Sequence, residues 1–187
     1  MLIIGLGNPN NEYGGTRHNV GSRIVAAFAK CMSVSFDKQE KLLAEVSKQG
    51  ENVLALPSTY MNNSGQAARA LMDWYKLEPK QVVAIHDDLD VPLGEIRIKF
   101  GGSAAGHNGV DSVAHHFSTA DFWRIRVGIG PEDEDLKAFR ANDTSSFVLS
   151  KFNSDELPVV EQVENMVCSR LNEWVIEPKE TNWRIHE

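Results

Sequence analysis

The chain has 187 residues, of which 42% are hydrophobic and 24% are charged, and its net charge is −7. This composition is typical of a globular protein that buries a sizeable core, and no apolar run approaches the ~20 residues of a membrane span. No basic segment followed by a long apolar stretch opens the chain, so we expect no secretory signal, no membrane partner and a location in the cytoplasm.

The negative charge is confined to the C-terminal part. Residues 1–130 carry 13 acidic and 13 basic residues, whereas residues 131–187 carry 13 acidic and 6 basic residues. A site built from the first 130 residues can therefore still bind an anion. Two cysteines, Cys31 and Cys168, lie in apolar helical patterns and indicate buried free thiols in a reducing compartment.

Apolar runs and turn residues predict alternating strands and helices along the first 130 residues. Gly50-Glu51 predicts a hairpin turn, and Ser64 is a candidate helix cap. The expected strands are residues 1–6, 42–48, 52–56, 82–85, 95–100 and 123–129, and the expected helices are residues 22–31, 64–75 and 108–117. This order predicts an α/β fold, a mixed twisted sheet sandwiched between helices, formed by a single domain over residues 1–187.

The C-terminal part has a different character. Residues 130–146 are polar and begin with the acidic run 132–135, which predicts a mobile loop. Residues 147–149 predict a short strand or one helical turn. A long amphipathic helix is expected from Ser154, and the polar tail from Glu177 is expected to be loosely held.

Four polar segments adjoin predicted strand or helix ends, namely residues 8–18, 60–65, 86–90 and 101–108. Ligands of open α/β sheets bind beyond the carboxyl ends of the strands. The topology therefore predicts that these segments converge there. The side chains that would meet are those of His18, Asp87, Asn8, Asn62 and Asn108.

A histidine beside a carboxylate is suited to activating water. The carboxylate would fix the tautomer of His18 and the other ring nitrogen could take a proton. The absence of a Gly-x-Ser-x-Gly motif, and of a cysteine in a suitable neighbourhood, favours direct attack by water. Taken singly, Asp87 could instead cap a turn, and His86 could be a core histidine.

Two other site chemistries have weaker support. Residues 5–10 resemble a dinucleotide-binding fingerprint, but its third glycine is Asn10, Pro9 interrupts the helix start, and no acidic residue follows about 20 residues later. The run His86–Asp90 contains metal-ligand types. No His-Glu-x-x-His or Cys-x-x-Cys motif accompanies it, so we expect no metal and no cofactor.

Four basic residues are spaced two apart on two predicted strands. Arg97 and Lys99 share one face of a strand, and Arg124 and Arg126 share one face of another. If the strands are neighbours, the four cations form a stripe suited to phosphate. The alternative is pairing with carboxylates such as Glu95.

These segments together resemble bacterial-type peptidyl-tRNA hydrolases. The resemblance runs in the family's order over about residues 1–152, and five motifs in order are highly specific. The matching motifs are Gly5–Pro9 with Tyr13 and Thr16–Asn19, Tyr60–Gly65, His86–Asp90, Gly106–Gly109 and Arg124–Gly130, followed by Phe147–Leu149 and Phe152.

The resemblance implies a monomeric, metal-independent hydrolase that cleaves the ester between a peptide and the 3′ end of tRNA, with a lid and helix over about residues 131–176. It implies that His18 is the general base and that Asp87 supports it. Substrate contacts are implied for Asn8, Tyr13, Tyr60, Met61, Asn62, His107 and Asn108, and a tRNA phosphate clamp for Lys99 and Arg126. A non-catalytic RNA-binding relative and a metal-dependent phosphoesterase are the alternatives.

The chain departs from the family pattern at three places. Ala105 replaces a common glycine, Asp111 stands where a basic residue is common, and the run 131–135 is acidic. None of these positions belongs to the implied catalytic set. They predict altered tRNA affinity and unaltered chemistry.

Overall fold

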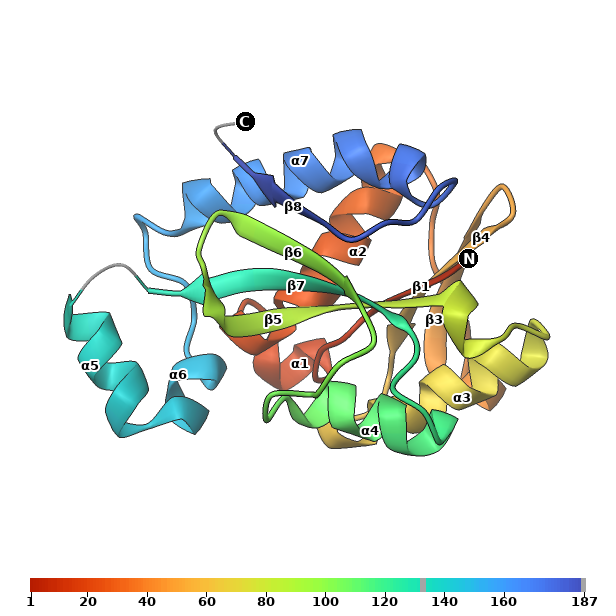
Figure 1. Ribbon diagram of the computed structural model, residues 1–187, viewed down its shortest axis with the longest axis horizontal. Helices are drawn as coiled ribbons and strands as arrows, with labels where there is room; N and C mark the ends of the chain where they lie inside the picture. Colours follow the sequence, from red (N-terminus) through yellow and green to blue (C-terminus); the bar gives the residue numbers. More distant parts are fainter. Residues whose placement is uncertain (132–133, 186–187) are drawn as a thin grey trace.

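The computed structural model describes residues 1–131 and 134–185, apart from the Asn10 side chain. Its centre is an eight-stranded mixed sheet with the order β2-β3-β4-β1-β5-β7-β6-β8 (Figure 1). The strands are β1 (Leu2–Gly5), β2 (Asp37–Gln39), β3 (Ala44–Gln49), β4 (Asn52–Pro57), β5 (Val82–Pro92), β6 (Glu95–Phe100), β7 (Trp123–Gly130) and β8 (Thr181–Arg184).

The middle of the sheet is parallel and its flanks are antiparallel. Strand β1 pairs in parallel with β4 and β5, and β5 pairs in parallel with β7. Strands β2, β3, β6 and β8 add antiparallel pairs at the two sides. The carboxyl ends of β1, β4, β5 and β7 therefore meet at one edge, as expected for a ligand site of an α/β sheet.

Helices cover both faces of the sheet. In Figure 1, α2 and α7 lie on one side, and α3 and α4 lie on the other. Successive side chains of β1 point to opposite faces of the sheet and so pack into both cores. Ile3 joins the cluster under α2 and α7, whereas Leu2 and Ile4 join the cluster under α3 and α4. The α-helices are α1 (Asn10–Tyr13), α2 (Val20–Cys31), α3 (Ser64–Trp74), α4 (Asn108–Phe117), α5 (Glu134–Asn142), α6 (Thr144–Leu149) and α7 (Leu157–Trp174).

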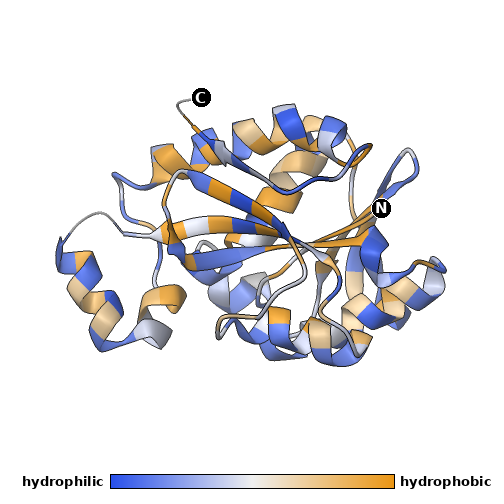
Figure 2. Cartoon of the chain, in the orientation of Figure 1, coloured by the Kyte–Doolittle hydropathy of each residue, from blue (hydrophilic) through white to orange (hydrophobic). Residues whose placement is uncertain are grey.

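The predicted fold class is confirmed. In Figure 2 the ribbons of β6 and α7 alternate between hydrophobic and hydrophilic colours, as elements with one buried face do. The predicted hairpin is β3–β4, and Gly50 in its turn has a φ of 60°. Within the described residues, no helix is long and apolar enough to cross a membrane.

One predicted helix cap and one predicted helix start are wrong. Helix α3 begins at Ser64 as predicted, but the Ser64 side chain makes no capping hydrogen bond. The C-terminal helix begins at Leu157, because Asn153 Oδ1 first accepts hydrogen bonds from the backbone N–H groups of Asp155 and Glu156. The local cap therefore sets this start later than Ser154.

Strand β5 is longer than predicted. The strand was expected to end at Ile85, yet it continues through the polar run 86–90 to Pro92. Pairing with β7 continues to Asp88, opposite Gly128, and the register shifts between Asp88 and Pro92. Polar side chains of this run thus project from a strand with an irregular end, instead of from a loop.

The predicted mobile loop over residues 130–146 is wrong where the structure describes it, because α5 and α6 occupy most of it. Residues 132 and 133 of the acidic run lie outside the described residues, while Glu134 and Asp135 form the first turn of α5. Acidic groups at a helix N-terminus are stabilising. Ring contact between Phe139 and Phe147, at 5.8 Å between centroids, joins the two helices.

The polar tail is more ordered than predicted. Strand β8 pairs with β6, placing Trp183 opposite Ile96. Trp183 is 7% exposed and belongs to the core under α7. Burial of this one large side chain stabilises a segment whose overall polarity indicated a loose tail.

The prediction of buried free thiols is wrong. Cys31 is exposed, Cys168 is half-buried, and the two form a disulfide that joins α2 to α7. Cys31 is the last residue of α2, where the helix emerges from the core, so the apolar pattern of the helix overstated its burial. Their Cα atoms lie 6.2 Å apart because the two helices pack side by side.

A buried histidine in β5 makes stability depend on pH. His86 is 4% exposed, and its Nδ1 donates to the backbone oxygen of Asp87 at 2.8 Å. Burial, with the nearby His107, lowers the pKa of His86 to about 3. The folded chain therefore binds fewer protons at His86 than the unfolded chain, in which a histidine has a pKa of about 6.5.

Stability from this group is fully present above about pH 6.5 and is lost as the pH falls toward 3. Lowering the pH from 7 to 5 should cost the wild-type chain about 2 kcal/mol more than it costs His86→Gln. Urea unfolding at the two pH values measures the difference. His115→Gln, which changes an exposed histidine of α4, is the control; equal losses in wild type and His86→Gln would contradict the assignment.

Candidate active site

A cavity of about 740 Å³ opens at the carboxyl ends of the parallel strands. All four predicted polar segments contribute to its wall. Each predicted catalytic and substrate-binding residue lines it, namely Asn8, Tyr13, His18, Tyr60, Met61, Asn62, Asp87, His107 and Asn108. The expected convergence of distant segments is thus present.

The His18 and Asp87 side chains form the predicted pair. Nδ1 of His18 lies 2.9 Å and 3.0 Å from the two carboxylate oxygens of Asp87. His18 belongs to the 3-10 helix η1 (Arg17–Asn19) that leads into α2. Gly21 allows this close approach, because a Cβ there would lie 2.1 Å from the backbone oxygen of Ile85 in β5.

A second histidine binds the same carboxylate. Nε2 of His107 lies 2.8 Å from Oδ1 of Asp87. Nδ1 of His107 accepts from the backbone N–H groups of Gly109 and Val110 at 3.1 Å and 3.2 Å, and so caps α4. Because Nδ1 accepts, the proton of a neutral His107 is on Nε2 and is donated to Asp87. The sequence indicated a substrate contact for His107 but not this bond.

Asp87 remains ionised in this surrounding. Burial alone would raise its pKa, but interaction with His107 and the hydrogen bonds from His107 and His18 outweigh burial and hold the pKa well below its usual range. An acceptor-only carboxylate directs the Nδ1 proton of His18 toward itself. The lone pair of His18 Nε2 is then available on the other side of the ring.

Asn8 is fixed by a network of amides. Its Oδ1 accepts from the backbone N–H of Met61 at 2.8 Å. Its backbone N–H donates to Asn19 Oδ1, and Asn19 Nδ2 donates to its backbone oxygen, both at 2.9 Å. The Asn8 side-chain NH₂ is its remaining donor group, and Asn8 lines the cavity.

Two aromatic rings of the cavity wall contact each other. The ring of Tyr13 packs edge-on against Tyr60, with centroids 6.4 Å apart.

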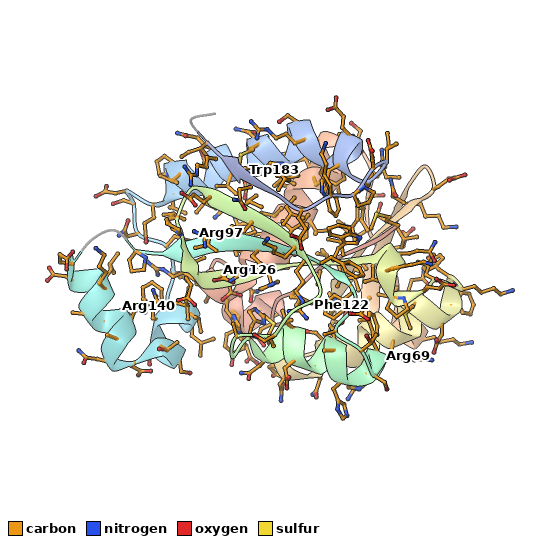
Figure 3. The ribbon with its side chains drawn as sticks, in the orientation of Figure 1. Arg69, Arg97, Phe122, Arg126, Arg140 and Trp183 are labelled. Carbon is orange, nitrogen blue, oxygen red and sulfur yellow. A yellow bond between two sulfur atoms is a disulfide. The ribbon has the colours of Figure 1, made fainter. Side chains whose placement is uncertain are left out.

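The site residues predicted from the sequence did not include one wall of the cavity. Helices α5 and α6 supply Arg140, Thr144, Ser145, Val148 and Leu149 to this wall. Arg140 donates to Asp90 at 2.7 Å, so an ion pair joins α5 to the end of β5 (Figure 3). The family resemblance implied a lid over about residues 131–176, and the short apolar run 147–149 was the signal in the residues themselves.

The predicted basic stripe is present beside the cavity. Strands β6 and β7 are neighbours, with Arg97 opposite Arg126 (Figure 3). On the same two strands, Lys99 lies opposite Arg124. Lys99, Arg124 and Arg126 line a second cavity of about 260 Å³. The two cavities share the wall residues Asp88, Ala104 and Ala105.

Carboxylates pair with these basic residues, so the predicted stripe and the predicted alternative of ion pairing are both present in part. Arg126 donates to Asp88 at 2.6 Å, Lys99 donates to Glu180 at 3.0 Å, and Arg97 lies 3.7 Å from Glu95. Arg124 is 3% exposed and donates to the backbone oxygen of Ser103. Buried Arg124 therefore holds the glycine-rich loop, while Lys99 and Arg126 remain partly exposed.

Two departures from the family pattern have local consequences for backbone strain and helix stability. Ala105 has a φ of 49°, in the left-handed region, where a non-glycine residue costs roughly 1–2 kcal/mol. Glycine at this position would remove that cost. Asp111 lies in the first turn of α4, where a carboxylate is stabilising.

The family model and the curated relatives identify the same family. The peptidyl-tRNA hydrolase family model matches residues 2–186. The chain is 45% identical over 165 residues to the peptidyl-tRNA hydrolase of Synechocystis sp., covering 86% of this chain and 82% of that protein. It is 40% identical over 180 residues to that of Bacillus thuringiensis, covering 95% and 94%.

A solved structure agrees in fold. The crystal structure of peptidyl-tRNA hydrolase from Acinetobacter baumannii superposes with a TM-score of 0.83 at 34% identity, covering 94% of this chain and 88% of that one. Family match, sequence identity and fold extend over nearly the whole chain. The chain therefore belongs to the peptidyl-tRNA hydrolase family.

Proposed function

We propose that this chain hydrolyses the ester that joins a peptide to the 3′ end of tRNA, with water activated by His18. Family membership supports the substrate and the reaction. The observation that carries the mechanism is the hydrogen-bonded set of His18, Asp87 and His107 on the wall of a cavity. This set gives the cavity a general base in a fixed orientation.

In the first step, His18 Nε2 takes a proton from water as the water oxygen attacks the ester carbonyl. The resulting imidazolium is stabilised by the ionised Asp87 on its other side. Asp87 gains no proton, since its pKa lies well below the usual range. The carbonyl oxygen becomes an oxyanion that requires nearby hydrogen-bond donors.

In the second step, the tetrahedral intermediate collapses and the ribose oxygen of the terminal nucleotide leaves. His18 returns its proton to this oxygen, as microscopic reversibility favours. The products are a tRNA with a free hydroxyl and a peptide with a carboxylic acid, which then gives its proton to the solvent. No covalent enzyme intermediate is required.

Amides and aromatic rings around the base provide the substrate contacts. The Asn8 amide donor recognises the blocked amino end of the peptide, and the hydrogen bond from the Met61 N–H to Asn8 Oδ1 supports this role by fixing the amide. Asn62, in the 3-10 helix that precedes α3, and Asn108, the first residue of α4, both line the cavity and hold the peptide main chain and the 3′ end. Tyr13 and Tyr60 pack against the substrate at the rim.

Lys99 and Arg126 form the tRNA phosphate clamp in this proposal. They lie together at the second cavity, which adjoins the first. Both have carboxylate partners, so a phosphate must compete with Glu180 and Asp88. Arg126 and Asp88 are the less exposed pair, so Glu180 is the partner that exchanges more easily.

We further propose that the enzyme acts as a one-domain monomer in the cytoplasm, where translation supplies its substrate. A family match that spans residues 2–186 supports one domain. Size-exclusion chromatography with light scattering measures the mass, and a mass near 20.8 kDa supports the monomer.

Replacing the base should remove activity on N-acetyl-aminoacyl-tRNA. His18→Ala should lower kcat by roughly 10²–10⁴-fold, because proton transfer is lost while substrate contacts remain. The wild-type kcat should rise with pH and then level off, because only an unprotonated base can accept a proton from water. Full activity in His18→Ala would refute the mechanism, and RNA binding without turnover by the wild type would favour the non-catalytic alternative. His115→Ala, on an exposed part of α4, is the control.

Chelation separates this mechanism from a metal-dependent phosphoesterase. The ligand atoms of His18, Asp87 and His107 lie within 4.8 Å of one another, which suits a transition metal as well as hydrogen bonds. We expect full activity after dialysis against EDTA and then metal-free buffer. Loss of activity that added Zn²⁺ restores would identify a metal enzyme.

Neutralising Glu180 should strengthen tRNA binding. Glu180→Gln leaves Lys99 without its carboxylate partner, and the tRNA dissociation constant should fall about two- to fivefold at low salt. Lys99→Ala should weaken tRNA binding. It should also reduce, by about 1, the slope of the logarithm of the binding constant against the logarithm of the salt concentration. Glu177→Gln, in the same exposed tail, makes the same change in net charge and is the control. Equal effects of the two glutamate variants would contradict competition at Lys99.

A further inference from the structure

Arg17, the residue before the proposed base, is buried between η1, called the catalytic turn below because it carries His18, and the C-terminal segment 150–156. We propose that Arg17 is a positioning residue for ester hydrolysis, which fixes His18 and the α6 wall of the cavity relative to each other. This inference rests on the proposed role of His18 as the general base. Arg17 itself does not line the cavity, so its action on the substrate is indirect.

The guanidinium of Arg17 connects three points of one distant segment. Nη1 donates to Ser150 Oγ at 2.6 Å and to the backbone oxygen of Lys151 at 2.5 Å, and Nη2 donates to Glu156 Oε2 at 2.5 Å. These acceptors lie more than 130 positions away in the sequence. A planar fork of donors can satisfy all three acceptors, which a lysine ammonium cannot do in the same geometry.

Aromatic rings enclose the same charge. The guanidinium carbon lies 4.6 Å from the centroid of the Phe147 ring and 5.2 Å from that of Phe152. Arg17 is 2% exposed and Glu156 is 8% exposed. A charge buried this deeply is costly unless it is paired, so the surrounding groups are held close to one arrangement.

The backbone of the catalytic turn is fastened to the same segment. The N–H of Arg17 donates to the backbone oxygen of Ser150 at 2.9 Å, and Thr16 and Lys151 form an isolated antiparallel bridge. His18 follows directly, and its ring must meet Asp87 on β5. Two anchors, one on each side of η1, therefore determine where the His18 ring lies.

Helix α6 is held by the same residue. Phe147 packs under the guanidinium, while the adjacent Val148 and Leu149 line the cavity. Ser150, which ends the helix, accepts from Arg17. The base and one wall of the substrate cavity thus share a single anchor, and a shift of either would misalign water and ester. Misplacement by about 1 Å can lower a rate by 10²-fold.

A second ion pair separates positioning from general stability. Arg23 and Glu164 also join α2 to α7, with Nε and Oε1 2.5 Å apart, but neither lines the active-site cavity. Breaking this pair should lower stability without moving His18. Arg23→Gln is therefore the matched control for variants of Arg17.

The test compares kcat and KM on N-acetyl-aminoacyl-tRNA, at a temperature where circular dichroism shows each variant to be folded. Arg17→Lys should lower kcat at least about tenfold and change KM less than about threefold, whereas Arg23→Gln should keep kcat within about twofold. The double variant Arg17→Met with Glu156→Gln removes the buried charges, so it should fold and remain slow. Ser150→Ala removes one acceptor and should give an intermediate loss.

The two proposals fail in different ways. Full activity in His18→Ala refutes the general base. If His18→Ala loses activity but the Arg17 variants are no slower than Arg23→Gln, the general base is supported and only the Arg17 proposal is refuted. If neither Arg17 variant folds, unchanged kcat in Ser150→Ala overturns the proposal, and a reduced kcat at unchanged KM supports it.

Discussion

One buried carboxylate organises the active site. Asp87 accepts hydrogen bonds from His18 and His107, and these bonds outweigh the cost of burying its charge. Because Asp87 only accepts, it determines the proton position on both rings. His107 then caps α4 with its other nitrogen, while His18 presents its other nitrogen to the cavity. Two histidines on the same carboxylate thus have different tasks, one structural and one proposed to be catalytic.

The fold brings these groups together through close backbone contacts. Gly21 permits α2 to begin against β5, which places η1 beside the Asp87 carboxylate. The opposite side of η1 is fixed by Arg17, whose buried guanidinium binds the chain between α6 and α7. Helix η1, which carries His18, is therefore held between the central sheet and the C-terminal region. This arrangement explains why a segment remote in sequence from the polar motifs forms one wall of the cavity.

Much of this could be predicted from the sequence, for identifiable reasons. Short apolar runs predicted the parallel strands, and the polar residues after them predicted the place of the cavity and the His18–Asp87 contact. Long-range packing was not predictable. Trp183 orders a polar tail, α5 forms without any buried residue, and Cys31 meets Cys168 across two helices. The double role of Asp87 was also missed, because nothing in local spacing indicates that His107 reaches it.

The central claim concerns where two protons lie. Nitrogen-15 NMR of the imidazole rings at neutral pH distinguishes the tautomers of neutral histidines. The account predicts that His18 carries its proton on Nδ1 and leaves Nε2 free, whereas His107 carries its proton on Nε2. In Asp87→Asn the preference of His18 should weaken, since the ionised acceptor is gone. A neutral His18 protonated on Nε2 in the wild-type chain would contradict the account, because no base would then face the substrate.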